Sequence, residues 1–215
     1  MKFNHNFLKT PELKQVTAED GQRYYETPSG NRYESVTTWI GRNSDKTYLT
    51  NWKERVGDTK ANSISNQAKK RGSALHGSIE DYLMNREVSF ANILEKDMFN
   101  KMKTYLNNIN NIRILESSLY SDRLKLAGTP DCIGDFLGVL SVIDFKTSTR
   151  EKLKQYVDGY FLQGACYADM YFQHYKVPPK RVVILIATED APTSVFVEPI
   201  IPAMNRLEEF RKKAA

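Results

Sequence analysis

Two stretches of the sequence, GTPDCIGDF at 128–136 and SVIDFKTST at 141–149, decide the fold and the candidate site. The first places an aspartate in a turn bracketed by glycines, and the second places an Asp-x-Lys inside an apolar strand. A carboxylate and an ammonium are both costly to bury unless each has a partner or a function. The two stretches therefore mark the first place to look for chemistry.

Side chains alternate along a strand, so the second stretch carries its two charged groups on one face. Asp144 and Lys146 point one way, and Ile143 and Phe145 point the other way. If the two strands pair antiparallel, Asp131 lies near Asp144 and can share a cation with it. Converging carboxylates suit a hard divalent ion such as Mg²⁺ or Mn²⁺. The alternative is structural: Asp131 is a turn residue, and Asp144 forms a simple ion pair with Lys146.

A predicted helix adds two more candidate ligands. In RGSALHGSIEDYL, His76 and Glu80 are one helical turn apart and share a face beside an apolar stripe. An imidazole ligand beside the carboxylates allows a site for Mg²⁺ to accept Mn²⁺ as well. In the alternative interpretation, His76 is a hydrogen-bonded core residue and Glu80 is a solvated surface residue.

Phosphodiester hydrolysis is the chemistry that these groups suit. One or two metal ions lower the pKa of a bound water and neutralise charge on the scissile phosphate. Lys146 can position the nucleophile or stabilise the transition state. We therefore expect Asp131, Asp144 and Lys146 to be catalytic with Glu80 assisting, and His76, Asp131 and Asp144 to hold the metal.

The motifs together resemble a known family. GTPD…DFK resembles the PD-(D/E)xK (restriction-endonuclease-like) nuclease core, and RGSALHGSIE resembles the His-bearing motif of its RecB-like exonuclease branch. QGACY, from Gln163 to Tyr167, matches the Q-x-x-x-Y motif of that branch, and Glu116 matches a glutamate that often opens the following strand. YESVTTWIG resembles the P-S-V-T segment of the mitochondrial genome maintenance exonucleases and their phage relatives, with Glu34 replacing the usual proline.

The resemblance implies a central mixed β-sheet flanked by helices and an exonuclease that digests single-stranded DNA from its ends. It implies that the backbone carbonyl of Phe145 contributes to the metal site, with Glu116 a further candidate. It also implies that Gln163 and Tyr167 orient the substrate or brace Lys146. The four-cysteine cluster of some relatives is absent, so no iron–sulfur cluster is expected.

A nuclease with little sequence preference would bind DNA through contacts to backbone phosphates and through base stacking. Basic residues flank the motifs on the helix and after the lysine strand, although they can equally be solubilising surface. The predicted substrate-binding residues are Gln163, Tyr167, Arg71, Lys70, Thr147 and Arg150.

Two rival functions stay open. A structure-specific endonuclease would use the same active site on flaps or junctions. A non-catalytic nucleic-acid-binding module would keep the fold without the reaction, and the intact Asp131, Asp144 and Lys146 argue against it. DNA with free ends is the expected partner, with a helicase or a strand-annealing protein as a possible second one.

The composition of the chain limits the class of protein and the compartment that we expect. The chain has 215 residues, a net charge of +5 and 40% hydrophobic residues, which predicts one soluble domain and permits a polyanionic partner. Two cysteines, no secretory signal and only strand-sized apolar runs favour a cytoplasmic protein of a bacterium or phage-infected cell, neither secreted nor associated with a membrane. Without an evident transit peptide, a phage or bacterial origin is favoured.

Hydrophobic periodicity predicts a mixed α/β domain. We expect a nuclease domain over 1–215, made of an N-terminal hairpin and helix (1–60), the PD-(D/E)xK core (61–200) and a C-terminal helix (201–215). Predicted helices cover about 44–56, 62–87, 91–110 and 154–175. Two strands are predicted within 21–41. Single strands are predicted at 112–121, 126–138, 139–147, 181–188 and 193–200.

Overall fold

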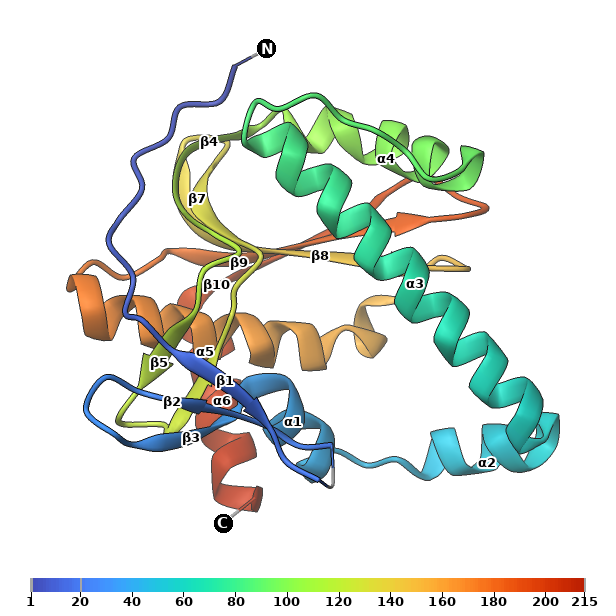
Figure 1. Ribbon diagram of the computed structural model, residues 1–215, viewed down its shortest axis with the longest axis horizontal. Helices are drawn as coiled ribbons and strands as arrows, with labels where there is room; N and C mark the ends of the chain where they lie inside the picture. Colours follow the sequence, from blue (N-terminus) through green and yellow to red (C-terminus); the bar gives the residue numbers. More distant parts are fainter. Residues whose placement is uncertain (1, 20, 215) are drawn as a thin grey trace.

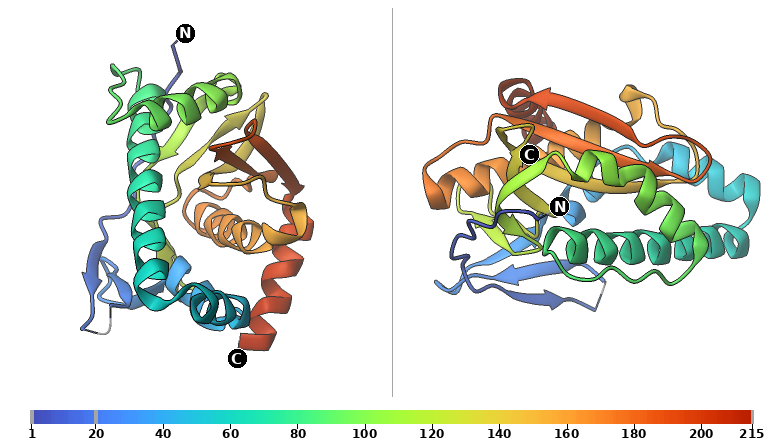
Figure 2. Two further views of the ribbon diagram at one scale, coloured as in Figure 1. Left: turned by 90° about the vertical axis from the view of Figure 1, so that its right-hand side faces the viewer. Right: turned by 90° about the horizontal axis from the view of Figure 1, so that it is seen from above.

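The structure is a computed structural model that describes residues 2–19 and 21–214. Met1, Asp20 and Ala215, which the expected 1–215 domain includes, lie outside the described residues. The described chain forms two five-stranded sheets with helices packed around them (Figures 1 and 2). None of its described helices combines the length and the apolar character that crossing a membrane requires.

The elements follow one another along the chain with short connections. The strands are β1 (Lys14–Thr17), β2 (Arg23–Glu26), β3 (Arg32–Ser35), β4 (Ile109–Leu115), β5 (Leu119–Ser121), β6 (Leu126–Gly128), β7 (Cys132–Phe136), β8 (Val139–Ser148), β9 (Arg181–Thr188) and β10 (Ser194–Pro199). The helices are α1 (Val36–Asn43), α2 (Thr47–Val56), α3 (Asp58–Leu83), α4 (Ile93–Leu106), the 3₁₀ turn η1 (Lys154–Tyr156), α5 (Asp158–Tyr175) and α6 (Ile200–Ala214).

The larger sheet has the order β10-β9-β8-β7-β4 and carries the two decisive stretches of sequence. β7 and β8 form the predicted antiparallel hairpin, with Cys132 opposite Ile143. β8 and β9 are parallel, and α5 makes the crossover between them. This confirms a mixed sheet flanked by helices.

Two cores lie on opposite faces of this sheet. Ile143, Phe145 and Leu185 belong to the core under α3 and α4, whereas Val142 and Ile184 belong to the core that α5 and α6 share. In Figure 1 the sheet accordingly runs between α4 above and α5 below. Because side chains alternate along β8, the neighbours of Phe145 turn toward α5. The apolar residues thus fix which way the polar ones point.

The smaller sheet has the order β1-β2-β3-β6-β5 and joins the N-terminal hairpin to the centre of the chain. β3 pairs in parallel with β6, so Glu34 lies opposite Leu126. Figure 2 shows this sheet beside α3, with its N-terminal strands in blue. It thereby supplies a wall for the site described below.

Several predicted boundaries were wrong. The second predicted N-terminal strand was too long: it ends at Ser35, and the residues after it form helix α1. Ser35 caps this helix, because its hydroxyl accepts a hydrogen bond from the Thr38 amide. The predicted strands at 112–121 and 126–138 are each divided between the two sheets. The first divides at Glu116, whose φ of 44° is left-handed. The second divides before Pro130, which has no amide hydrogen to donate to a strand.

The helices also differ at their ends. The helix predicted at 44–56 starts later, at Thr47, and the one predicted at 62–87 is longer at its start and stops at Leu83. The third predicted helix begins only after Asn92, whose side chain caps it by accepting from the Glu95 amide. The fourth begins as a 3₁₀ turn, and the C-terminal helix starts at Ile200, before the predicted boundary.

Candidate active site

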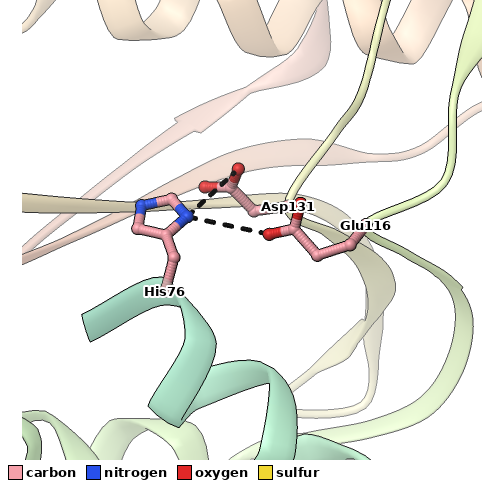
Figure 3. A group of neighbouring side chains, drawn as sticks. All are labelled: His76, Glu116 and Asp131. Carbon is pink, nitrogen blue, oxygen red and sulfur yellow. Dashed lines mark ion pairs between the residues drawn. The ribbon is translucent and has the colours of Figure 1, made fainter. Parts of the chain in front are cut away.

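Three side chains from distant parts of the chain meet in one cluster. His76 comes from α3, Glu116 follows β4, and Asp131 immediately precedes β7 (Figure 3). Nδ1 of His76 lies 3.7 Å from Oε1 of Glu116 and 3.7 Å from Oδ1 of Asp131. One ligand atom from each residue fits within 4.8 Å of the other two. We call these three residues the acidic cluster.

The backbone of Phe145 on β8 orients two members of the acidic cluster. Nε2 of His76 lies 2.8 Å from the Phe145 carbonyl oxygen, which can only accept, so Nε2 carries a hydrogen. This leaves Nδ1 directed at the two carboxylates. The amide of Phe145 donates to Oδ2 of Asp131 over 2.7 Å, which leaves Oδ1 facing the cluster. One strand residue therefore sets the rotation of both side chains.

Glu116 reaches the cluster because its backbone takes an uncommon conformation. Its φ is 44°, in the left-handed region that residues with a Cβ rarely occupy. Its amide donates to the carbonyl oxygen of Asp131 over 3.1 Å, which ties the loop to the hairpin. Backbone strain of this kind persists where the surrounding structure imposes it, and it concentrates at functional sites.

The acidic cluster attracts a positive charge. Burial opposes protonation of His76, but Glu116 and Asp131 outweigh it and raise the pKa of His76 to about 9. A proton at Nδ1 is therefore the group that balances the two carboxylates in the metal-free protein. One imidazole nitrogen and two carboxylate oxygens form a donor set that fits Mn²⁺ or Mg²⁺, and a divalent ion can take the place of this proton.

A buried ion pair lies next to the cluster. The carboxylate of Asp144 is 1% exposed, and Nζ of Lys146 lies 2.5 Å from it. Burial raises the pKa of Asp144, and the attraction of Lys146 offsets only part of this effect. The ring of Tyr160 on α5 supports the ammonium, with its centroid 5.2 Å from Nζ. Lys146 is thus held by two neighbours while remaining partly accessible.

The acidic cluster and Lys146 line a cavity of ≈ 420 Å³. Gln163 and Tyr167 on α5 line it as well, and Nε2 of Gln163 donates to the Tyr167 hydroxyl over 3.3 Å. A Cβ at Gly128 would lie 3.0 Å from Cε1 of Tyr167, so a larger residue at this position would require the ring to shift. The cavity has the size of a small-molecule site, for which about 300–1,000 Å³ is usual.

Other predicted site residues lie outside the acidic cluster. Glu80 lines a neighbouring hollow with His76 but pairs with Arg86 over 3.0 Å. Arg71 pairs with Glu189. Lys70 and Arg71 line a separate cavity between α3 and the start of α4.

The remaining predicted residues border the cluster or lie away from it. Asp144 is beside the cluster and pairs with Lys146, whereas the Phe145 carbonyl accepts from His76. Thr147 faces α3, where its hydroxyl would be 3.8 Å from a Cβ at Gly72. Arg150 is exposed after the end of β8.

Sequence reasoning missed the part of the cavity lining that comes from the N-terminal segment. Gln15, Arg23, Tyr25, Ser35 and Thr37 of the N-terminal segment line it. Two of them belong to the hydroxyl-rich SVTT segment, which was noted only as part of a family resemblance. Nothing in the local pattern of this segment indicates that it faces the acidic cluster.

Part of the chain is similar in sequence to two mammalian exonucleases. The chain is 28% identical over 120 residues to human mitochondrial genome maintenance exonuclease 1, covering 53% of this chain and 34% of the human protein. The mouse protein is 27% identical over 111 residues, covering 49% of this chain and 33% of the mouse protein. The chain thus spans about a third of the length of these curated relatives.

A crystal structure from Eubacterium rectale, provisionally described as an exonuclease, aligns with a TM-score of 0.48 and 14% identity, covering 68% of this chain and 63% of that one. No protein-family profile matches the chain. The sequence similarity to the human and mouse proteins confirms the resemblance to the mitochondrial genome maintenance exonucleases that the motifs indicated.

Proposed function

We propose that this protein is a metal-dependent exodeoxyribonuclease that hydrolyses phosphodiester bonds from the ends of single-stranded DNA. The observation that carries the proposal is the acidic cluster, oriented by the Phe145 backbone and opening beside Lys146 into one cavity. The similarity to exonucleases supports a nuclease in general. DNA replication, recombination or repair in a bacterium or phage-infected cell is the proposed setting.

His76, Glu116 and Asp131 would hold the divalent ion, with Asp144 next to them. The ion supplies a bound water of lowered pKa and positive charge for the scissile phosphate. Lys146 lines the same cavity and would supply a fixed positive charge to balance the negative charge that the phosphate gains in the transition state. Its hydrogen bond to Asp144 and the Tyr160 ring hold this charge in place without reorganisation during the reaction.

Two exposed aromatic residues support a single-stranded substrate. Tyr156 in η1 is 65% exposed and Tyr48 in α2 is 69% exposed, so their rings are available to unpaired bases. Base stacking on such rings tolerates any sequence, which agrees with little sequence preference. Lys152 and Lys154 shortly precede Tyr156 in the sequence and can contact phosphates.

The test compares linear with circular single-stranded DNA, each labelled, in Mn²⁺, in Mg²⁺ and in EDTA. The proposal expects the parent protein to degrade only the linear strand and only with metal. Lys146→Ala should lose the activity, and Lys213→Ala, on the exposed side of α6, should keep it. Cleavage of the circle would make the protein an endonuclease. Binding without any cleavage would make it a nucleic-acid-binding module.

A further inference from the structure

The lining of the cavity includes donors from the N-terminal part of the chain that the proposed reaction does not use. Arg23 comes from β2, Ser35 from the end of β3, and Thr37 from the first turn of α1. All three line the same cavity of ≈ 420 Å³ as Asp131 and Lys146. We call these three residues the N-terminal wall.

The hydrogen bonds of the N-terminal wall leave one hydroxyl free to donate. Oγ of Ser35 accepts from both the amide and the hydroxyl of Thr38, each over 3.3 Å. Its own hydrogen is therefore directed at Oγ1 of Thr37, 3.0 Å away. That oxygen also accepts from the Arg23 guanidinium over 2.9 Å. With its lone pairs used, the Thr37 hydroxyl has its hydrogen left for a group in the cavity.

Arg23 brings a positive charge that no described acidic residue neutralises. Within residues 2–19 and 21–214, no carboxylate lies within 4.0 Å of its guanidinium, whereas Arg42, Arg71, Arg123 and Arg206 each pair with an acid. Its hydrogen bond to Thr37 uses one of five donor hydrogens. The remaining donors are available to an acceptor with several oxygens.

We infer that the N-terminal wall binds the terminal phosphate monoester of the DNA strand, a role that rests on the proposed function of the cavity. A terminal phosphate has three free oxygens and about −1.5 to −2 charges, which matches an unpaired guanidinium fork beside a free hydroxyl donor. An internal phosphodiester offers only two such oxygens and a single charge. The cavity thus holds the last nucleotide between two phosphate sites, the acidic cluster with Lys146 and the N-terminal wall.

The smaller sheet supplies the N-terminal wall and its surroundings. Gln15 of β1 also lines the cavity, and antiparallel pairing sets it opposite Tyr25, two residues after Arg23 on β2. The hairpin of β1 and β2 therefore contributes several residues to this part of the cavity. A terminal phosphate site at this wall would select ends over internal positions.

Binding in EDTA tests the N-terminal wall without any cleavage. Labelled single-stranded oligonucleotides carry a 5′-phosphate, a 3′-phosphate or only hydroxyl ends, and their affinities are measured by fluorescence anisotropy. The parent protein should prefer one phosphorylated end by about tenfold, as expected for charge-assisted hydrogen bonds. Arg23→Gln should abolish the preference, Thr37→Val should weaken it, and Thr37→Ser should retain it.

A matched control separates local contact from net charge. Arg32 on β3 is exposed and lies over the Tyr24 ring, 4.2 Å from its centroid, outside the cavity. Arg32→Gln removes the same charge as Arg23→Gln and should leave the preference intact. Inorganic phosphate and deoxynucleoside monophosphates serve as competitors to tell a strand-end site from a site for free phosphate.

Three results would overturn the inference: equal affinity for phosphorylated and hydroxyl ends, a preference that survives Arg23→Gln, or competition by inorganic phosphate as strong as by the phosphorylated strand. None of these depends on catalysis. A protein that shows the preference but cuts no DNA would refute the proposed nuclease function and leave the phosphate site standing.

Discussion

The metal-free protein should lose stability as the pH rises from 6.5 to 9, because His76 gives up its proton. Burial opposes protonation, but Glu116 and Asp131 raise the pKa of this histidine from 6.5 to about 9 in the folded state. The folded protein therefore binds the proton more tightly than the unfolded chain does. The resulting stabilisation is complete below pH 6.5 and is lost as the pH passes 9.

The magnitude follows from the size of the pKa shift. Each pKa unit corresponds to about 1.4 kcal/mol, so the shift sets an upper bound of about 3 kcal/mol. The His76 side chain is 29% exposed, and water screens its attraction to the carboxylates. We therefore expect the free energy of unfolding to fall by about 1–3 kcal/mol over this pH range.

Urea unfolding in EDTA between pH 6 and pH 9.5 measures this effect directly. The parent protein is compared with His76→Gln, which cannot take up the proton, and with Glu209→Gln, an exposed change on α6. The Glu209→Gln profile should follow the parent, and the His76→Gln profile should be flatter. Identical pH profiles for the parent and His76→Gln would refute the assigned geometry of the cluster.

Two further changes test packing and charge behind the site. Gly164→Ala would place a Cβ 2.3 Å from Cγ1 of Val182, so we expect a loss of about 1–3 kcal/mol in urea unfolding. Gly159→Ala in the same helix meets nothing within 4 Å and should cost nothing, and equal losses for the two would contradict the close packing of α5 on β9. Lys146→Met leaves the 1% exposed carboxylate of Asp144 unpaired and should destabilise by about 3–5 kcal/mol. Adding Asp144→Asn should recover part of that loss, and a double variant no more stable than Lys146→Met would show that the pair is not buried as described.

The hairpin that carries the ion pair was predictable because it is local. Strand alternation alone places Asp144 and Lys146 on the face opposite Phe145, and the tight turn at Leu137 and Gly138 sets the antiparallel pairing of β7 with β8. The family resemblance implied that the Phe145 carbonyl contributes to the metal site, and in the structure this carbonyl accepts from His76 while the Phe145 amide donates to Asp131. The sequence therefore predicted the strand and the face to which each of its side chains points. The hydrogen bonds that the Phe145 backbone makes with His76 and Asp131 could be identified only in the structure.

The remaining parts depend on contacts between segments far apart in the chain. Arg23 and Thr37 reach the cavity because β3 pairs in parallel with β6, which joins Glu34 to Leu126. Glu116 reaches the cluster through a left-handed backbone conformation that its residue type disfavours. Propensity and periodicity carry no information on either feature, so the N-terminal wall was missed and the strand through Glu116 was drawn too long.

The most direct test of the account is the binding of Mn²⁺ to the protein without DNA, measured by isothermal titration calorimetry. We predict a site that Glu116→Gln and Asp131→Asn each weaken at least about tenfold, since each removes a charged ligand. Glu209→Gln should bind Mn²⁺ as the parent does. Unchanged affinity in both cluster variants would contradict the claim that His76, Glu116 and Asp131 form the metal site.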